Sequence, residues 1–520
     1  MKSSFTFVFL FLALFLTEKA SAQIWVRYNV ANSQIVSDHV STIAFDGKGN
    51  KWIGSLDSGL VKFDGKTWTN LTSKINQVGV LALATLNNDL WVATGNGGGL
   101  QKFDGSTWTN VAPNSHAEYS NALVTDNLGQ LWDGNDAGLS VLHPSGSWNT
   151  YLSTQTNTHF PSDNISALAV DNSGNIYACF TFQFGLVKLN GVNGDGTLIS
   201  SDAYPDFPKD YVTSIAIDWS GNIWAATKTS GVVKVAGSNT KVFSQSTDAT
   251  FIDDVVNTVT VDGCGHVWIG TIHGAAMYDG SKWTQYNKAN SQLPNDTVYY
   301  IGVDGPGHIW FCTNDGLEEL KPLPQKIDLL SPANASTVTT DSTNLKWYFD
   351  CPGILKYWVE IADNSSFTNS KIDTTNATLT QSASLWDNGL VNHATYYWKV
   401  KAMNDAGWSA FSDTWSFGVN IPANAVKESN NAGFELEQNY PNPFAAETTI
   451  KLYVPNHATL SLKIFDELGH EKATILQGAF EKGQYSIPFD LTSHYLQSGA
   501  YFYTLQSGAT ILQKSMQVIH

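Results

Sequence analysis

The apolar and polar positions of residues 23–321 follow one repeating pattern. In residues 40–55 an apolar strand ends at Asp, a turn containing Gly follows, and the next strand begins beside a large aromatic side chain. Short alternating strands separated by turn residues predict antiparallel β-structure. The aromatic position recurs seven times, at steps of 39 to 47 residues, at Trp52, Trp91, Trp132, Tyr177, Trp224, Trp268 and Trp310. A period in the low forties with several short strands is typical of a β-propeller blade, so seven blades are predicted.

The first complete unit divides into four strands, predicted over residues 40–45, 51–55, 60–63 and 67–71. Asp-Gly at residues 64–65, 104–105 and 279–280 is a two-residue hairpin signal. A Gly opens the third strand of every unit, at Gly59, Gly99, Gly138, Gly185, Gly231, Gly274 and Gly316. An Asp also lies in most hairpin turns between the first two strands, where we expect a structural role, at Asp46, Asp126, Asp171, Asp218, Asp262 and Asp304.

The seventh unit lacks an outer strand, and the missing strand is found near the N-terminus. Residues 25–34 (WVRYNVANSQ) closely match residues 283–292 (WTQYNKANSQ), which form the outer strand of the sixth unit. We therefore predict that residues 24–28 pair with the last blade and close the ring, which removes the exposed edges of an open sheet.

Two further β-modules follow the propeller. Residues 326–420 contain longer alternating strands that predict a β-sandwich. At residues 397–402 (YWKVKA) and 404–409 (NDAGWS) this segment resembles a fibronectin type III domain, which implies a spacer or an adhesive platform. Residues 421–433 read as a polar linker. The predicted fold class is all-β: a seven-bladed propeller closed by an N-terminal strand, followed by two sandwich domains.

Residues 434–520 carry ordered motifs that point to export. These are residues 439–444 (NYPNPF), the Gly-x-Tyr element at residues 499–501, and the terminal residues 513–518 (QKSMQV). The segment resembles the C-terminal sorting domain of the type IX secretion system of Bacteroidetes-type bacteria. That resemblance implies contact with the secretion machinery, passage across the outer membrane and removal of the domain, followed by release or surface attachment.

The first 22 residues have the composition of a secretory signal peptide. Lys2 precedes an apolar run over residues 5–16, and small residues lead to a predicted cleavage between Ala22 and Gln23. That run is too short to span a bilayer comfortably, and we expect no membrane-spanning segment. The net charge of -17, with 14% charged residues, disfavours a nucleic-acid partner.

Four cysteines in an exported chain raise the question of disulfides. Cys179 and Cys312 occupy equivalent buried positions in blades that do not touch, whereas Cys264 and Cys351 fall in different domains. We therefore expect all four to be free thiols.

The blades resemble the two-component regulator propeller repeat, at Asn222, Ile223 and Trp224 and their equivalents. In that family such propellers often form sensor regions of membrane-bound kinases, but this chain has no predicted membrane segment and no kinase domain. The resemblance therefore implies a separate exported propeller that binds a ligand on one face. We expect that face where the loops before each first strand meet the loops between the second and third strands.

The residues of these loops form the predicted ligand face. The candidates are Asp38, Glu118, Tyr119, Asp163, Phe182, Phe184, Asp210, Tyr211, Lys228, Asp254, His273, Asp296 and Asp315. Aromatic and polar side chains together suit glycan recognition, with an extracellular protein as the other partner class. The carboxylates could instead accept N–H groups of their own loops. A divalent cation at Asp210, Asp254 and Asp296 is a further alternative; no other cofactor is expected.

We expect a non-catalytic binding protein, because the motifs of common hydrolases are missing. The sequence contains no His-Glu-x-x-His zinc motif and no Gly-x-Ser-x-Gly elbow. The alternatives are a structural or adhesive surface component and a lyase or hydrolase. A propeller lyase would pair His273 with Asp254 or Asp315. His266 and His308 lie on the opposite face and are interpreted as turn residues.

Overall fold

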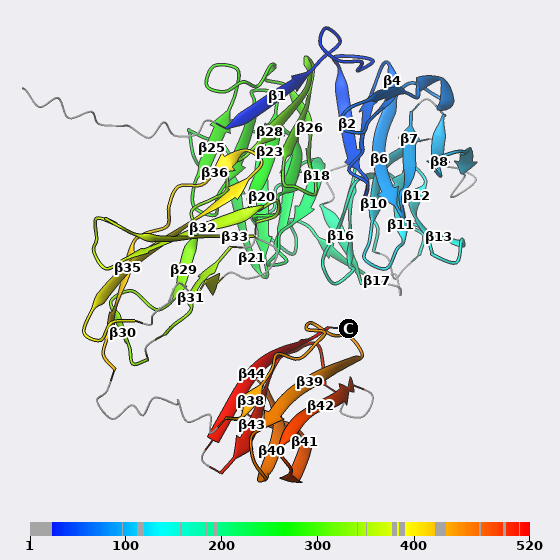
Figure 1. Cartoon of the computed structure of the whole chain (residues 1–520). Coiled ribbons are helices and arrows are strands. Elements are labelled where there is room, and N and C mark those ends of the chain that lie inside the picture. Colours follow the sequence, from blue (N-terminus) through cyan, green and yellow to red (C-terminus); the bar gives the residue numbers. More distant parts are fainter. Residues whose placement is uncertain are drawn as a thin grey trace, which may run out of the picture. The chain divides into compact units, whose positions relative to one another are not determined.

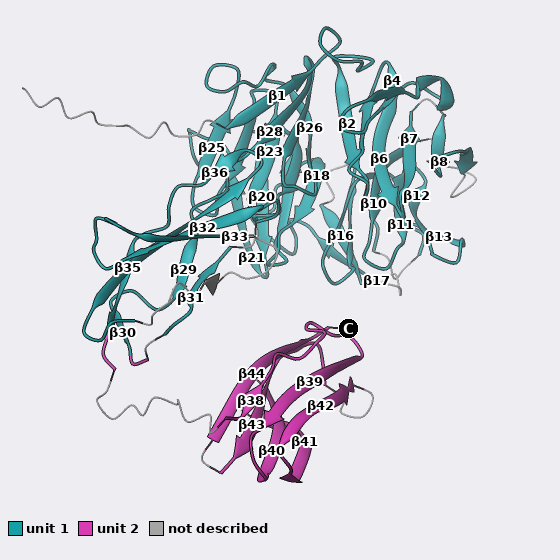
Figure 2. Ribbon diagram, viewed as in Figure 1, with its two compact units in different colours: residues 1–338, 342–418 teal, residues 339–341, 419–520 magenta. Residues whose placement is uncertain are grey.

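The computed structural model describes most of the chain after residue 22 (Figure 1). The described residues are 23–95, 97–111, 119–155, 159–181, 185–190, 195–340, 342–349, 351–376, 382–383, 390–421, 433–466, 470–491, 496–508 and 510–519. The predicted signal peptide and cleavage residue Ala22 lie outside these residues, as does most of the predicted linker. The chain divides into two compact units, residues 1–338 with 342–418, and residues 339–341 with 419–520 (Figure 2).

The first unit begins with seven four-stranded antiparallel sheets, which confirms the seven predicted blades. In the first blade β2 (Val40–Phe45) is innermost, followed by β3 (Lys51–Ser55), β4 (Gly59–Phe63) and β5 (Trp68–Asn70); η1 (Thr72–Lys74) is a single 3₁₀ turn. All seven glycines that open the third strands have φ between +63° and +125°, a region that side chains disfavour.

The other blades repeat this order. Their strands are β6 (Val80–Leu86), β7 (Asp89–Thr94), β8 (Gly99–Phe103), β9 (Trp108–Val111); β10 (Ser120–Thr125), β11 (Leu131–Asn135), β12 (Gly138–Leu142), β13 (Trp148–Tyr151); β14 (Ile165–Val170), β15 (Ile176–Phe180), β16 (Leu186–Asn190), β17 (Asp195–Ile199); β18 (Val212–Ile217), β19 (Ile223–Thr227), β20 (Val232–Ala236), β21 (Asn239–Phe243); β22 (Val256–Val261), β23 (Val267–Thr271), β24 (Ala275–Tyr278), β25 (Trp283–Tyr286); and β26 (Val298–Val303), β27 (Ile309–Thr313), β28 (Gly316–Lys321).

The N-terminal strand closes the ring as predicted. β1 (Ile24–Tyr28) pairs antiparallel with β28, with Trp25 opposite Leu320, so the last sheet runs β1-β28-β27-β26. Trp25 stacks on Phe311 with ring centroids 5.7 Å apart. The turns after β1 and β25 share the same hydrogen bonds: Ser33 Oγ donates to Asn29 O, and Ser291 Oγ donates to Asn287 O, both at 2.7 Å. The sequence match between these segments therefore reflects one local structure used twice.

In six of the seven blades the Asp of the hairpin turn holds the key aromatic residue in place. The Trp224 indole donates to Asp218 Oδ2 at 2.9 Å, and the Asp218 Oδ1 atom accepts two backbone N–H groups of its own turn. The same bond recurs in five other blades, at Trp52, Trp132, Tyr177, Trp268 and Trp310. The second blade has no Asp at this turn position, and the buried Trp91 indole N–H has no partner. The predicted structural role of these aspartates is confirmed.

One buried carboxylate in the third blade lacks a full set of partners. Asp133 is 0% exposed; its Oδ2 atom accepts from Asn135 at 2.9 Å, whereas its Oδ1 atom has no partner. Burial raises the pKa of Asp133 to about 6, and the hydrogen bond from Asn135 offsets this effect only in part. A carboxyl whose pKa rises on folding stabilises the fold below pH 4 and loses that contribution as the pH rises through 6.

Replacing Asp133 with Asn is therefore expected to stabilise the propeller at pH 7.5 by up to about 3 kcal/mol, since each pKa unit corresponds to about 1.4 kcal/mol. Denaturant unfolding at pH 7.5 and pH 4 measures this, and the gain should vanish at pH 4. Asp195→Asn, at an exposed position of β17, is the matched control. Equal stability of the wild type and Asp133→Asn at both pH values would contradict the assignment.

The propeller is followed by a two-sheet sandwich in the same compact unit. The smaller sheet contains β29 (Asp328–Ser331), β31 (Leu345–Tyr348) and β34 (Ser382–Ala383). Trp347 of the smaller sheet packs edge-on against Tyr357 of the larger sheet at 5.2 Å. The larger sheet contains β30 (Ser336–Val338), β32 (Lys356–Ala362), β33 (Lys371–Asn376), β35 (Thr395–Asn404), β36 (Gly407–Trp408) and β37 (Trp415–Val419). The predicted sandwich is present; its assignment to the fibronectin type III family stays a prediction.

The sandwich is joined to the bottom of the propeller, the face formed by the turns between first and second strands. Cys264 forms a disulfide with Cys351, with Cα atoms 4.5 Å apart. The expectation of four free thiols is therefore wrong for this pair, because docking of the two domains brings residues 87 positions apart together. Cys179 and Cys312 are buried free thiols, as predicted.

His308 lies at the centre of the joint, so its interpretation as a plain turn residue is incomplete. Its Nδ1 atom is 2.9 Å from Glu319 and 3.3 Å from Asp304, and its Nε2 atom is 3.0 Å from Asp405 of the sandwich. Lys321 forms a second ion pair with Asp405, at 2.9 Å. Because both imidazole nitrogens face carboxylates, the ring is a protonated donor at both positions.

The second unit is a separate β-sandwich with its own core, which includes Phe444, Ile450, Leu462 and Tyr503. One sheet runs β38-β39-β42 and the other β41-β40-β43-β44. The strands are β38 (Glu435–Leu436), β39 (Glu447–Val454), β40 (Ala458–Asp466), β41 (Glu471–Phe480), β42 (Gly483–Asp490), β43 (Gly499–Ser507) and β44 (Thr510–Val518).

Candidate ligand-binding channel of the propeller

Each innermost strand carries a β-bulge directly after its first residue. In every blade the pairing with the second strand skips one position, and a bulge redirects the side chain of the skipped residue. The seven skipped residues all line a central cavity of about 330 Å³: Ser41, Leu81, Asn121, Ser166, Thr213, Asn257 and Tyr299. The propeller therefore contains a channel wall to which every blade contributes one side chain.

Most of these side chains also bind the neighbouring blade. The Ser41 hydroxyl donates to Val80 O at 3.0 Å, and Val80 is the first residue of the next innermost strand. The equivalent bonds at four other junctions measure 2.5 to 3.1 Å and join Asn121 to Ile165, Ser166 to Val212, Thr213 to Val256, and Asn257 to Val298. These bonds fix the channel wall and use one donor of each of these five side chains. The hydroxyl and amide oxygens keep acceptor capacity toward the channel.

The channel is polar but uncharged. Every residue that lines the described cavity is neutral at pH 7. Its rim is charged: His39 packs against Tyr299 with ring centroids 5.0 Å apart, and His39 Nδ1 lies 3.7 Å from the Asp57 carboxylate. Asp57 also accepts from the Ser55 hydroxyl at 2.6 Å, which with other hydrogen bonds lowers its pKa. The site therefore offers a neutral interior that accepts hydrogen bonds and a mouth that carries an aspartate and an imidazole.

The predicted loop carboxylates hold loops of the propeller together. Asp38 Oδ1 accepts from Val30 N at 2.8 Å, on the loop that follows the closing strand. Asp210 accepts from Tyr211 N and from the Thr229 backbone and hydroxyl. Asp163, Asp254 and Asp296 accept from the loop after the preceding outer strand, at Ser153 N, Gln245 N and Lys288 N respectively. These contacts favour the structural interpretation of the carboxylate series.

The remaining predicted residues are spread around the face. Tyr119 is 38% exposed, and its N–H donates to Asp136. The Lys228 ammonium lies 5.9 Å from the Tyr211 ring centroid. Asp315 forms an ion pair with Arg27 of the closing strand at 3.0 Å. Glu118, Phe182 and Phe184 lie outside the described residues.

His273 does not form the pair that a lyase was predicted to use. Its Nδ1 atom is 2.7 Å from Asp253 Oδ2, rather than from Asp254 or Asp315. Asp253 is buried and also accepts from Val255 N, whereas the His273 side chain is 68% exposed. Asp254 instead accepts from Gln245 N, and Asp315 binds Arg27. The correction follows from the loop geometry, in which Asp253 rather than its neighbour points toward His273.

Two groups of side chains within the described ranges have metal-ligand spacing, and neither includes the predicted cation residues Asp210, Asp254 and Asp296. The first group contains Asp262, Cys264 and His266, but the Cys264 sulfur is used in the disulfide. The second contains Asp304, His308 and Glu319 at the joint. There the protonated imidazole neutralises the carboxylates. Burial opposes protonation, but the hydrogen bonds and charges of those carboxylates outweigh it and raise the pKa of His308 to about 10. Both groups serve the joint between propeller and sandwich.

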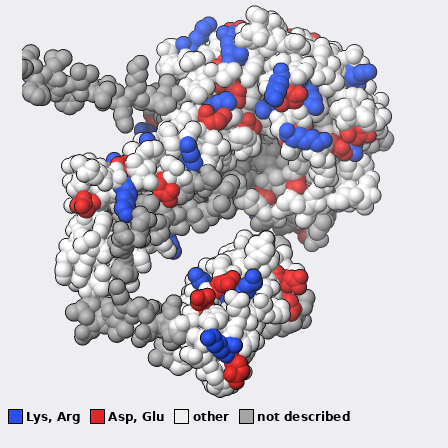
Figure 3. Space-filling view, viewed as in Figure 1, with Lys and Arg blue, Asp and Glu red and all other residues white. Residues whose placement is uncertain are grey.

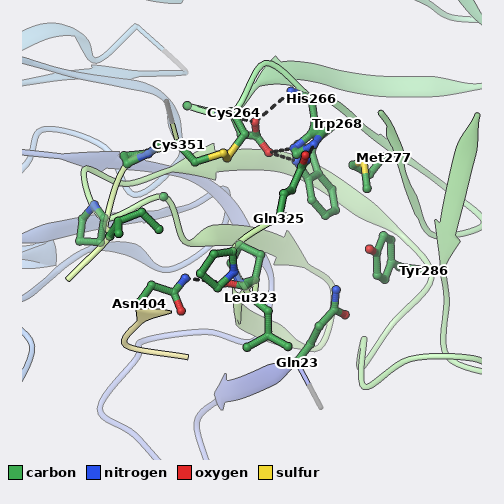
Figure 4. A pocket seen from close by; sticks show the side chains of 18 residues that line it. Gln23, Cys264, His266, Trp268, Met277, Tyr286, Leu323, Gln325, Cys351 and Asn404 are labelled. Atoms are coloured by element: carbon green, nitrogen blue, oxygen red, sulfur yellow. Dashed lines mark hydrogen bonds and ion pairs between the residues drawn. A yellow bond between two sulfur atoms is a disulfide. The ribbon is translucent and has the colours of Figure 1, made fainter. Parts of the chain in front are cut away.

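A second cavity, of about 220 Å³, lies at that joint. Figure 4 shows Cys264, Cys351, His266, Gln325 and Leu323 around it. His266 Nδ1 is 2.8 Å from Asp262, its other nitrogen contacts Gln325, and Asn404 donates to Pro322 O at 2.7 Å. The polar groups of this cavity therefore join the two domains.

The channel residues were not predicted from the sequence, although they lie at a nearly constant distance from the key aromatic residue of each blade. They lie 11 residues before the key aromatic in six blades and 10 residues before it in the second. Their types range from Ser and Thr to Asn, Leu and Tyr, so no residue pattern marks them.

Comparisons with known proteins agree with this architecture. Residues 32–192 match the family model described as DUF6242 beta propeller domain, and residues 438–519 match the Secretion system C-terminal sorting domain. The sorting domain indicates secretion, attachment at the cell surface and interaction with the secretion machinery. A search of curated proteins finds no match. None of the helical segments in the described ranges has the length and hydropathy of a membrane span.

Several solved structures have related folds. The extracellular domain of a hybrid two component system from B. thetaiotaomicron is 17% identical, with a TM-score of 0.50, over 76% of this chain and 57% of that chain. Virginiamycin B lyase from Staphylococcus aureus is 14% identical (TM-score 0.48; 58% and 100% covered). PorZ from Porphyromonas gingivalis is 13% identical (0.43; 95% and 61%). The chain thus spans under two thirds of the first and last of these structures, and such identities show the fold alone.

The fold and the two family matches agree on the organisation of the molecule. This chain is a β-propeller protein that ends in a secretion system C-terminal sorting domain.

Proposed function

We propose that this protein is an exported, non-catalytic binding protein of the cell surface whose propeller channel takes a neutral glycan. The observation that carries the proposal is the ring of seven bulged residues around an uncharged cavity of about 330 Å³. Hydroxyl-rich ligands both donate and accept hydrogen bonds, and the channel wall presents hydroxyl and amide groups whose oxygens keep acceptor capacity.

Charge supports a neutral ligand. Figure 3 shows acidic and basic side chains interspersed on the visible face of the molecule, without a broad basic area. The sandwich contacts described above lie at the bottom of the propeller, opposite the channel mouth. An extracellular protein loop inserted at the mouth is the second candidate partner, since Tyr119 and His273 are exposed there.

A variant that fills the channel tests the proposal. Leu81 lines the cavity and makes no bond between blades through its side chain, so Leu81→Trp is expected to obstruct the channel while the other contacts stay intact. A glycan array with the full chain identifies a ligand, and calorimetry should show at least about tenfold weaker binding by Leu81→Trp. Leu128→Trp, in an exposed bottom turn, is the matched control.

The outcomes separate the alternatives. Glycan binding that is equal in wild type and Leu81→Trp would place the ligand outside the channel. A wild-type protein that binds no glycan would reject the glycan proposal. Turnover of a glycan that His273→Ala abolishes would favour the enzymatic alternative, because the His273–Asp253 pair is then required for chemistry.

A further inference from the structure

Two sequence elements of the sorting domain have different structural roles. The Gly-x-Tyr element is part of the core: Tyr501 is 8% exposed, and its hydroxyl donates to Gln497 O at 3.1 Å. Packing and hydrogen bonding therefore explain that tyrosine. Tyr440, in the Tyr-Pro-Asn-Pro element, is 82% exposed, the highest value among the exposed large apolar side chains of the described residues. Because the Tyr440 ring is exposed, it contributes almost nothing to the stability of the domain.

The backbone under Tyr440 is nevertheless held firmly. Tyr440 exchanges two backbone hydrogen bonds with Thr449, each 3.0 Å long. The preceding residue, Asn439, is 2% exposed and donates through its amide to Thr448 Oγ1 at 3.0 Å and to Pro441 O at 3.1 Å. Its N–H donates to the Tyr503 hydroxyl at 2.8 Å. The core thus fixes the position from which the exposed ring projects.

The same loop is bonded to the end of the chain. Gln517 N donates to Asn442 Oδ1 at 2.7 Å, and Phe444 N donates to Gln517 O at 3.0 Å. Ile519 N donates to Phe444 O, and Ile519 is 46% exposed. Tyr440, Pro441, Pro443 and Ile519 are exposed apolar side chains of the two segments that these bonds join, and we name this group the Tyr440 surface.

We propose that the Tyr440 surface is the contact through which the sorting domain binds a protein receptor of the secretion machinery. The proposal rests on the export role of this domain. An exposed aromatic ring on a fixed backbone can fill a pocket of a partner at low entropic cost, which is the character of interface anchors. The charged residues from 435 to 450 are Glu435, Glu437 and Glu447, all exposed, and these disfavour an anionic lipid surface.

The test is export of the full chain from a bacterium with a type IX secretion system. Tyr440→Ala is expected to reduce the exported fraction about tenfold. Its melting temperature should stay within about 2 °C of the wild type, because the ring is exposed. Tyr440→Phe should export normally, since it keeps the ring. Ile511→Ala, which removes a half-exposed apolar side chain elsewhere on β44, is the control and should also export normally.

Each outcome bears on one claim. If the wild type and a variant without residues 438–519 are exported equally, the export role itself fails. If export needs residues 438–519 but Tyr440→Ala is exported like the wild type, the Tyr440 proposal fails and the export role stands. Purified wild type that binds vesicles of zwitterionic lipid, with binding lost in Tyr440→Ala, would assign the surface to the membrane and overturn the receptor proposal.

Discussion

Replacing His308 with Gln is expected to lower the free energy of unfolding of the propeller–sandwich unit by about 3–5 kcal/mol at pH 7, as when one partner of a buried ion pair is removed. The imidazole is 9% exposed and contacts Asp304, Glu319 and Asp405. A neutral amide would leave these carboxylates close together, with Lys321 as the nearest remaining cation. Urea unfolding followed by circular dichroism measures the loss.

The pH dependence gives a sharper test. Burial alone would lower the pKa of His308, but the hydrogen bonds and charges of the three carboxylates raise it to about 10. A histidine whose pKa rises on folding contributes stability that is complete below pH 6.5 and disappears as the pH rises through 10. The difference between wild type and variant should therefore shrink steadily between pH 6.5 and pH 10.

His266→Gln provides the matched control. His266 occupies the same turn position in the sixth blade, but only Asp262 faces it as a carboxylate partner in the described contacts. The decrease in the free energy of unfolding should be clearly smaller in His266→Gln than in His308→Gln. Equal losses for the two variants, or a His308→Gln protein as stable as the wild type, would show that the joint does not depend on the imidazolium charge.

Removing the disulfide is expected to have a comparable effect. In the double variant Cys264→Ser, Cys351→Ser the loss should approach about 4.6 kcal/mol by the loop-entropy relation, because the bond joins residues 87 positions apart. Protease cleavage of the connection at residues 322–325 should become faster, since the sandwich separates more readily from the propeller. Unfolding curves and timed proteolysis measure the two effects.

Reduction of the wild type supplies the control. Dithiothreitol should reproduce the destabilisation in the wild type and have no further effect on the double variant. Alkylation of the unreduced, denatured protein should label two cysteines, Cys179 and Cys312. Labelling of four cysteines in protein purified from an oxidising compartment would contradict the bond.

The ring of blades could be predicted from the sequence because its determinants are local. Trp224 and Asp218 lie six residues apart and bind within one hairpin, so the same pair recurs wherever the hairpin recurs. The closing strand was also predictable, because residues 25–34 repeat the pattern of residues 283–292. The first feature depends on neighbours in the chain, and the second could be recognised because one local pattern is used twice.

The channel and the joint could not be predicted in the same way. A bulge selects a position, so Leu81 and Asn121 both face the channel although their side chains share no chemistry. The joint depends on how the sandwich docks, and neither Cys351 nor Asp405 carries a local sign of its partner. One signal for the disulfide was available in the sequence. Cys179 and Cys312 occupy the same buried position of their blades, whereas Cys264 and Cys351 do not, and these two remain as a possible pair in an exported chain.

The position of β1 has a consequence for how the molecule is made. Tyr28 bonds Glu319, 291 residues further along the chain. The first-synthesised strand of the propeller therefore finds its partner only when nearly all of the ring has emerged, and such non-local pairing is slow. A product truncated before residue 316 would retain Trp25 without Leu320 and the rest of β28, leaving an apolar strand available for self-association.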